Sequence, residues 1–296
     1  MPLKTLTSIG IEVLKNNSLN KISDSLEDLH IEDALQLREI EANALQGCKR
    51  LRTLHITRAP KLKRISDGVF AAHFPSFKML RIAHSGLEVI PNMNQLRTDP
   101  TIIAMIDFDS NNIRNITSGS VKVKAENFIL DHNEIEVIQD WSFHDSQIAN
   151  LSFKGNTKLR LVTEDAFFGL KNLRSLDLSG TSITRLPTRG LSSLEVLKLT
   201  DVLDLWEFPS VLHFPDIKEA YLTYSYHCCA FRFPVTHDPK EFSRLQSLHR
   251  DVHRRYCAST DHPLLEIPST TTQESTRRRR HVSTTTGEVE DTGGWR

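Results

Sequence analysis

Apolar and polar residues alternate along this chain in a fixed short pattern, which is clearest over residues 173–186. The pattern has three leucines, one polar residue and two further apolar residues: Leu173, Leu176, Leu178, Thr181, Ile183 and Leu186. The alternation at its start predicts a short β-strand, because successive strand side chains point to opposite faces. The polar residue predicts a turn. The two later apolar residues then predict a second inward-facing layer.

The pattern recurs over most of the chain. Its strand positions are Leu26/Leu29/Ile31, Leu51/Leu54/Ile56, Phe77/Leu80/Ile82, Ile103/Ile106/Phe108, Ala125/Phe128/Leu130, Ile148/Leu151/Phe153, Leu173/Leu176/Leu178, Leu194/Leu197/Leu199 and Ile217/Ala220/Leu222. Successive middle positions are 25, 26, 26, 22, 23, 25, 21 and 23 residues apart, within the period of about 20–29 residues of leucine-rich repeats. A weaker tenth copy, Leu6/Ile9/Ile11, precedes them.

One copy cannot bury its own apolar face, so the copies must stack. We therefore predict an α/β leucine-rich repeat solenoid with a curved parallel sheet on its concave face and an irregular or short helical convex side. The turn position carries residues that can bond unpaired backbone groups: Asn111, Asn133, Asn156, Ser85 and Thr181. Three aromatic residues late in their repeats are expected to fill the convex side of the core: Phe70, Phe143 and Phe167.

Residues between the strand leucines are predicted to face outward from the concave side. They are Asp28, His30, Glu32, His55, Arg81, Asp107, Asp109, Asp131, Lys154, Asp177, Lys198, Glu219 and Tyr221. The centre of this set is mostly acidic. It is either an ordinary solvated face or a binding surface for a basic partner, which a strip of one charge would attract and orient. On the second interpretation, the ligand-facing residues are Asp107, Asp109, Asp131, Lys154 and Asp177.

Composition excludes several other functions. The chain has 296 residues with 37 basic and 37 acidic side chains, so it is not a polybasic nucleic-acid binder. No Ser/His/Asp set, metal-ligand spacing or phosphate loop is evident, so we predict no enzyme, no cofactor and no metal site.

No apolar run is long enough to cross a membrane, and the start MPLKTLTSIG lacks a secretory pattern. The chain is then either cytosolic or, as we expect, an internal piece of a larger protein.

Glycosylation sequons and cysteines add local expectations. The sequons begin at Asn16, Asn115 and Asn150; Asn115 should face water, whereas Asn150 falls on a concave strand position. Cys48 is expected to be a small buried apolar residue. Adjacent Cys228 and Cys229 cannot easily bond each other. They need other partners or remain thiols.

The repeats are predicted to span residues 1–223, followed by a cysteine-containing hinge over residues 224–257 and a disordered tail over residues 258–296. In the hinge, Asp238, Pro239 and Glu241 form a helix-start signal. An amphipathic helix should follow and end near Cys257, through Phe242, Leu245, Leu248, Val252 and Tyr256. A metal cluster of His227, His249, His253 and the cysteines is an alternative, but no C-x-x-C spacing supports it.

Residues 181–191 and the HCCAF sequence at 227–231 resemble the last repeats and the hinge of the glycoprotein hormone receptors. In that family an extracellular leucine-rich repeat domain binds a cystine-knot hormone on its concave face. A hinge then passes the signal to a seven-helix membrane domain coupled to G proteins. The resemblance implies a hormone-binding domain on the extracellular side of the plasma membrane, with a cystine-knot glycoprotein hormone as its partner.

The resemblance also implies that a G protein is engaged through a membrane domain absent from this chain. Cys228, Cys229 and Cys257 would pair with cysteines outside the chain. The alternative that stays open is a secreted leucine-rich repeat module or decoy that binds protein without signalling.

Overall fold

The computed structural model describes residues 3–7, 10–99, 102–232 and 239–244. The chain divides into two compact units, residues 1–258 and 259–296. The second unit lies outside the described residues, so the fold below is that of the first unit.

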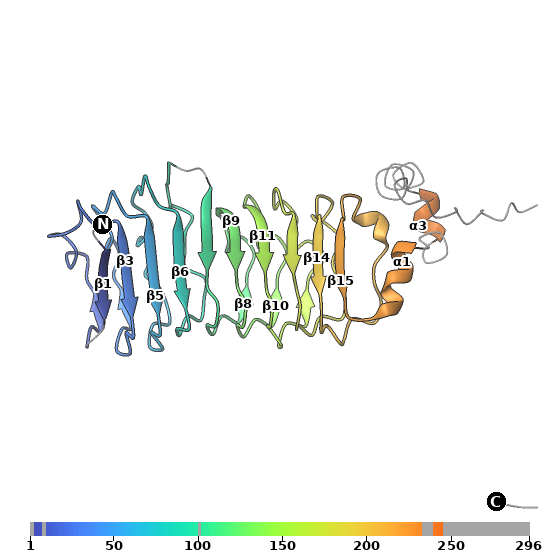
Figure 1. Cartoon of the computed structure of the whole chain (residues 1–296), viewed down its shortest axis with the longest axis horizontal. Coiled ribbons are helices and arrows are strands. Elements are labelled where there is room, and N and C mark those ends of the chain that lie inside the picture. The colour runs from blue at the N-terminus through green and yellow to red at the C-terminus, as the bar shows by residue number, and fades with distance from the viewer. Residues whose placement is uncertain (1–2, 8–9, 100–101, 233–238, 245–296) are drawn as a thin grey trace, which may run out of the picture. The chain divides into compact units, whose positions relative to one another are not determined.

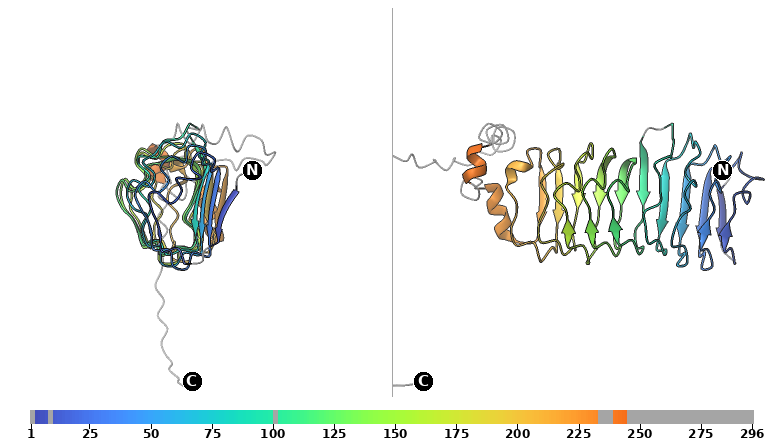
Figure 2. Two further views of the ribbon diagram at one scale, coloured as in Figure 1. Left: turned by 90° about the vertical axis from the view of Figure 1, so that its left-hand side faces the viewer. Right: turned by 180° about the vertical axis from the view of Figure 1, so that it is seen from behind.

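The first unit is built around one parallel sheet of ten strands, which follow one another in chain order (Figure 1). The strands are β1 (Leu3–Thr7), β3 (Asp28–Glu32), β5 (Thr53–Thr57), β6 (Met79–Ala83), β7 (Ile103–Asp107), β9 (Lys124–Ile129), β11 (Gln147–Ser152), β13 (Ser175–Asp177), β14 (Val196–Leu199) and β15 (Glu219–Leu222). Each repeat contributes one strand. The chain then returns along the opposite side of the coil, as the end-on view in Figure 2 shows.

The strand pairing confirms the predicted phase of all nine main repeats. The predicted middle positions pair in one continuous row: Leu29, Leu54, Leu80, Ile106, Phe128, Leu151, Leu176, Leu197 and Ala220. All of these except Ala220 are buried. The alternation of apolar and polar residues therefore sets which side of each strand faces the core.

The predicted tenth copy, Leu6/Ile9/Ile11, is wrong in phase. Strand β1 pairs with β3 so that Leu6 lies opposite Ile31, which places Leu6 at the third strand position and not the first. A second pairing, between β2 (Val13–Leu14) and β4 (Glu39–Ile40), explains the shift. Leu14 serves as the closing residue opposite Ile40, so the strand of this repeat must lie further upstream.

The side of the coil opposite the sheet is irregular, as predicted, and carries two small parallel sheets that were not predicted. One contains β8 (Asn115–Ile116), β10 (Val137–Ile138) and β12 (Leu161–Val162), and the other contains β2 and β4. The helices among the described residues all follow residue 210: η1 (Val211–His213), η2 (Ser225–His227), α1 (Cys228–Arg232) and α3 (Pro239–Arg244). The repeats thus turn back by extended segments and tight turns.

Buried asparagines connect neighbouring coils, as the turn position predicted. The Asn156 amide donates to the carbonyl oxygens of Leu130 and Phe153 at 2.9 and 2.7 Å. Its carbonyl oxygen accepts the backbone N–H of Ile135 at 3.3 Å. Asn133 and Asn111 make corresponding bonds one and two coils earlier, respectively. These side chains satisfy backbone groups that the turns leave buried and unpaired.

Aromatic side chains fill the core on the side away from the sheet. Phe70, Phe143 and Phe167 are at most 2% exposed, which confirms their predicted burial. The rings of Phe143 and Phe167 stack with centroids 5.9 Å apart. The core therefore continues from coil to coil.

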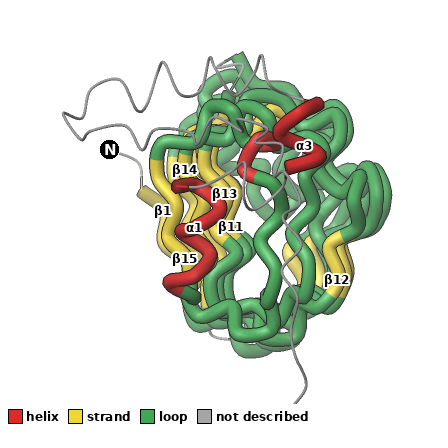
Figure 3. Tube along the Cα trace, turned by 90° about the vertical axis from the view of Figure 1, so that its right-hand side faces the viewer, coloured by secondary structure: helices red, strands yellow, loops and turns green. Residues whose placement is uncertain are grey.

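Within the HCCAF sequence, His227 ends the 3-10 turn η2 and the next four residues belong to the short helix α1, which lies beside β15 at the C-terminal end of the sheet (Figure 3). This helix was not predicted. His227 is 4% exposed, and its Nε2 lies 3.2 Å from the carbonyl oxygen of Trp206. Helix α3 begins at Pro239 as predicted, but its expected continuation to Cys257 lies outside the described residues. Within the described ranges, no helix combines the length and apolar character needed to cross a membrane.

Candidate ligand-binding face

The outward-facing side of the ten-stranded sheet, which we call the sheet face, presents polar side chains in rows. Because the strands pair in register, equivalent residues lie side by side across the sheet. The row beside the buried middle positions contains His30, His55, Arg81, Asp107, Ile129, Ser152, Asp177, Lys198 and Tyr221. Eight of these nine residues are polar, so the face offers hydrogen-bond and charge contacts.

Asp107 lies on the sheet face but is largely covered, with a side chain only 5% exposed. One carboxylate oxygen accepts the Asp109 backbone N–H at 2.9 Å, and the other lies 3.4 Å from Arg81 Nε. These contacts hold the turn after β7. Asp107 therefore offers little surface to a ligand.

Asp109 is more accessible, with 20% of its side chain exposed. Its carboxylate lies 2.9 Å from Nδ1 of His132 and accepts the Ser110 hydroxyl at 2.9 Å. A second imidazole, that of His84, approaches to 3.7 Å. Asp109 is thus the centre of a small polar cluster formed by three consecutive coils.

Asp131, Lys154 and Asp177 lie together on the C-terminal half of the sheet face. Asp131 is half-buried and accepts bonds from the Ser152 hydroxyl and, at 2.9 Å, from the Lys154 backbone N–H. Burial raises the pKa of Asp131 above its ordinary value, and the charge of Asp177 adds to this, although the two hydrogen bonds oppose it. The surroundings of Asp131 therefore disfavour its charged form.

Lys154 and Asp177 line a shallow depression together with Lys198 and Tyr221. The Asp177 carboxylate accepts the Ser179 backbone N–H at 2.9 Å and lies 3.8 Å from Lys198 Nζ. Lys154 is exposed. The depression therefore contains charges of both signs, and the acidic excess expected from sequence is partly balanced by cations of adjacent coils.

The predicted glycosylation asparagines differ in accessibility. Asn16 and Asn115 are exposed, whereas Asn150 is half-buried and donates to Oδ1 of Asn127 at 3.0 Å. A glycan could extend freely from the first two positions. The position of Asn150 on the sheet face is as predicted.

The described cysteines fall into two groups. Cys48 is 1% exposed, as predicted, and burial raises the pKa of its thiol to about 11. Cys228 and Cys229 are exposed and unpaired within the described part of the chain. Cys257 lies outside the described residues, as do His249 and His253 of the alternative metal cluster.

Sequence reasoning missed two features of this surface. His30, Glu32 and His55 were placed on the concave face, but the proximity of their side chains was not foreseen because they belong to different repeats. Stacked aromatic rings of Trp206, Tyr224 and Tyr226 form a ladder at the C-terminal end. In the sequence, Trp206 lies in a separate repeat from the two tyrosines, so their stacking depends on how the segment after β15 packs against the preceding coil.

Comparison with known proteins agrees with this architecture. A family model described as "Leucine rich repeat" matches residues 124–183, and one described as "BspA type Leucine rich repeat region (6 copies)" matches residues 3–94. The Toll receptor in the Toll–Spatzle complex from Drosophila superposes with a TM-score of 0.60 at 19% identity, over 74% of this chain and 31% of the other. The chain belongs to the leucine-rich repeat proteins.

Its sequence relatives include receptors for glycoprotein hormones. The follicle-stimulating hormone receptors of Cavia porcellus and Homo sapiens are each 31% identical to it, over 157 and 155 residues. The lutropin-choriogonadotropic hormone receptor of Bos taurus is 30% identical over 154 residues. The matches cover about half of this chain, at 52%, 51% and 51%, but 22% of each receptor. They confirm the family resemblance indicated by residues 181–191 and 227–231.

Proposed function

We propose that this chain is the hormone-binding part of a glycoprotein-hormone-type receptor and binds a cystine-knot protein hormone on the sheet face. The observation that carries the proposal is the similarity to follicle-stimulating hormone and lutropin receptors over half of the chain. The polar rows of the sheet face support it, because extended repeat surfaces are suited to binding large partners.

Among the ligand-facing residues, we assign the direct contacts to Asp109, Asp131, Lys154 and Asp177. Asp107 has the supporting role of fixing the Asp109 backbone, since its carboxylate is nearly covered. The sheet face carries charges of both signs. It therefore favours a partner whose charges are opposite in sign and match them in position. Electrostatic complementarity of this kind chiefly raises the association rate and the specificity.

We also propose the remaining organisation by analogy with the receptors. Residues 1–223 form the repeat domain, residues 224–257 the hinge and residues 258–296 a tail. The cysteines Cys228, Cys229 and Cys257 pair with cysteines of a longer protein. That protein lies in the plasma membrane with this part outside the cell, carries glycans on Asn16, Asn115 and Asn150, and engages a G protein through a membrane domain. The chain itself has no enzymatic role in this arrangement.

Surface plasmon resonance with follicle-stimulating hormone and lutropin as probes tests the binding. We expect saturable binding of at least one hormone to the full chain produced in a secretory host. Asp131→Asn and Lys154→Ala should each weaken it by about tenfold or more, as loss of a central contact of about 1.4 kcal/mol does. The association rate should fall as salt is raised, because exposed charges are screened.

Glu136→Gln is the matched control. Glu136 is exposed next to β10, on the side of the coil opposite the sheet face, so its loss of charge should leave binding unchanged. Equal weakening by Glu136→Gln and Asp131→Asn would contradict the assignment to the sheet face. Binding by the full-length gene product without a G-protein response in hormone-treated cells would favour the non-signalling module instead.

A further inference from the structure

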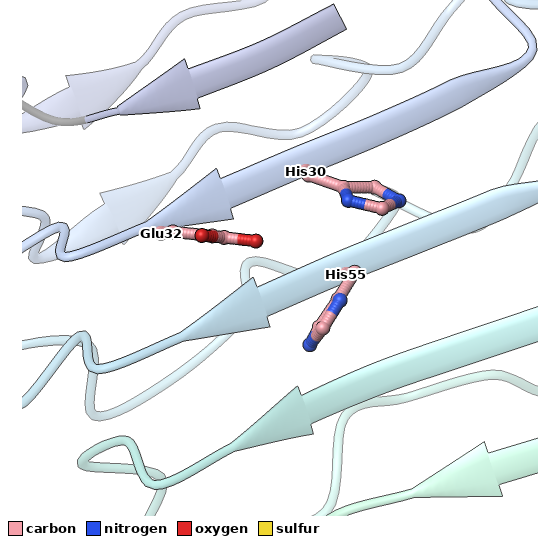
Figure 4. Close-up of side chains that lie close together, drawn as sticks. All are labelled: His30, Glu32 and His55. Atoms are coloured by element: carbon pink, nitrogen blue, oxygen red, sulfur yellow. The ribbon is translucent and has the colours of Figure 1, made fainter. Parts of the chain in front are cut away.

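Three potential metal ligands meet on the sheet face near its N-terminal end. His30 and Glu32 lie on β3, and His55 lies on β5 directly opposite His30. All three side chains rise from the same side of the sheet and lie beside one another (Figure 4). One nitrogen of each imidazole and one carboxylate oxygen lie within 4.8 Å of one another.

The arrangement results from the register of the strands. Residues two apart on one strand face the same way, and the opposite residue on a parallel neighbour faces that way too. A histidine and a glutamate two residues apart therefore meet a histidine of the next coil. The His30 and His55 rings meet edge to face with centroids 5.2 Å apart.

The histidines are available as ligands. His55 Nε2 is buried, and among the described residues no group forms a hydrogen bond with it. An unpartnered buried nitrogen is unusual, because burying a polar atom without a partner is unfavourable. Burial, followed by the neighbouring His30 and Arg81, lowers the pKa of His55. This shift favours the neutral imidazole, which is the form that binds a metal ion.

The neighbouring cations do not occupy the site. Arg81, next to His55 in the row, lies 3.4 Å from the Asp107 carboxylate. Arg58, which follows β5, forms a two-pronged contact with Asp33. The carboxylate of Glu32 makes no ion pair among the described residues. It is free to turn toward the two imidazoles.

Zinc fits this donor set best. Two imidazoles and one carboxylate are a common protein ligand set for zinc when one further position stays open. In such a site, with bond lengths of about 2.0–2.2 Å, donor atoms lie roughly 3.3 Å apart. The separation here closes to that value by rotation of side chains that are only half-buried.

We propose that His30, Glu32 and His55 form a zinc-binding site on the sheet face, with the remaining coordination position open to solvent. A carboxylate or imidazole of a bound protein can enter that position. The site is independent of the four residues assigned to hormone contact and does not require the proposed receptor function.

Titration of the metal-free full chain with Co²⁺, followed by displacement with Zn²⁺, tests the site. We expect one ion per chain with the visible absorption of nitrogen- and oxygen-bound Co²⁺, and loss of that absorption on adding Zn²⁺. His30→Ala and His55→Ala should each weaken binding by at least about tenfold, because loss of even an outer-shell partner costs about 10–100-fold. Glu32→Gln should weaken it in the same direction.

His132→Ala and His84→Ala are matched controls, since both imidazoles lie on exposed positions beside Asp109. They should retain the wild-type affinity. Zinc should raise the melting temperature of the wild type and of the controls, but not of His30→Ala or His55→Ala, and all variants should melt alike without metal. Equal affinity in the site variants and the controls, or the absence of any saturable ion, would overturn the proposal.

Discussion

At the scale of single residues, the acidic side chains of the sheet face have different roles despite similar positions in the repeat. Asp107 and Asp177 each accept a backbone N–H two residues further on, at 2.9 Å in both cases. Asp131 accepts a backbone N–H of the next coil instead. These carboxylates therefore organise the turns, and those that are accessible are also the residues proposed to face a ligand. The sequence pattern alone could not separate the two roles, because both use an aspartate at an outward-facing position.

The raised pKa of Asp131 predicts a pH dependence of stability. Between the ordinary pKa of an aspartate and the higher value in the fold, the folded protein binds more protons than the unfolded chain. Its free energy of unfolding therefore falls as the pH rises through that window. Asparagine does not titrate, so Asp131→Asn removes this fall in the free energy of unfolding. The variant should therefore gain stability relative to wild type as the pH rises from 4 to 7, as measured by urea unfolding.

Asp33→Asn is a control of opposite sign. The hydrogen bond from Arg58 lowers the pKa of Asp33, so its carboxylate stabilises the fold above its ordinary pKa. Relative to wild type, this variant should lose stability as the pH rises through the window below the ordinary pKa of 3.8, where the folded carboxylate is ionised and the unfolded one still binds a proton. A change of the same sign in both variants would show that the environment of Asp131 is misassigned.

At the scale of elements, each strand is determined by the alternation of buried and outward-facing residues. Strand β13 shows this in three residues, since Leu176 is fully buried while Ser175 and Asp177 on either side are partly exposed. This period-2 pattern is local, which is why it could be read from sequence for nine repeats. The first repeat could not be phased in this way, because its strand is defined by the partner β3 and by the closing layer of β2 and β4.

Leu176→Ala tests the assignment of the strand phase. Removing a fully buried leucine side chain leaves a cavity in the core, and we expect a loss of about 2–5 kcal/mol in the free energy of unfolding. Ser175→Ala, one residue earlier on the outer side of the strand, should change it by less than about 0.5 kcal/mol. Chemical denaturation of both variants measures the difference. Similar losses in the two variants would refute the phase.

At the scale of the whole molecule, the stacked coils need their core closed at each end. At the C-terminal end this closure includes α1, whose Ala230 is 1% exposed and belongs to the same continuous core as the repeats. Phe231 contacts Phe208 with ring centroids 5.2 Å apart. The HCCAF sequence thus has a structural role in the fold, in addition to its value as a family marker.

Ala230→Asp should therefore destabilise the repeats from their end. An unpaired charge at a buried position costs about 3–5 kcal/mol, so the melting temperature should fall clearly. Cys229→Asp introduces the same charge at the adjacent exposed position and should have little effect in reducing buffer. Differential scanning calorimetry compares the two. An unchanged melting temperature for Ala230→Asp would show that α1 does not close the core.

The sequence by itself determined the class of fold, the phase of nine repeats, the buried asparagines of the turns and the family resemblance. All of these follow from local periodicity or short motifs, and periodic patterns act within one repeat. Only the tertiary structure decided which outward-facing residues meet across repeats. The meeting of His30, Glu32 and His55, the covering of Asp107 and the closure by α1 depend on strand register and on packing between coils. Register and packing bring together residues of different repeats, about 20 or more positions apart in the sequence. No pattern within one repeat specifies these contacts.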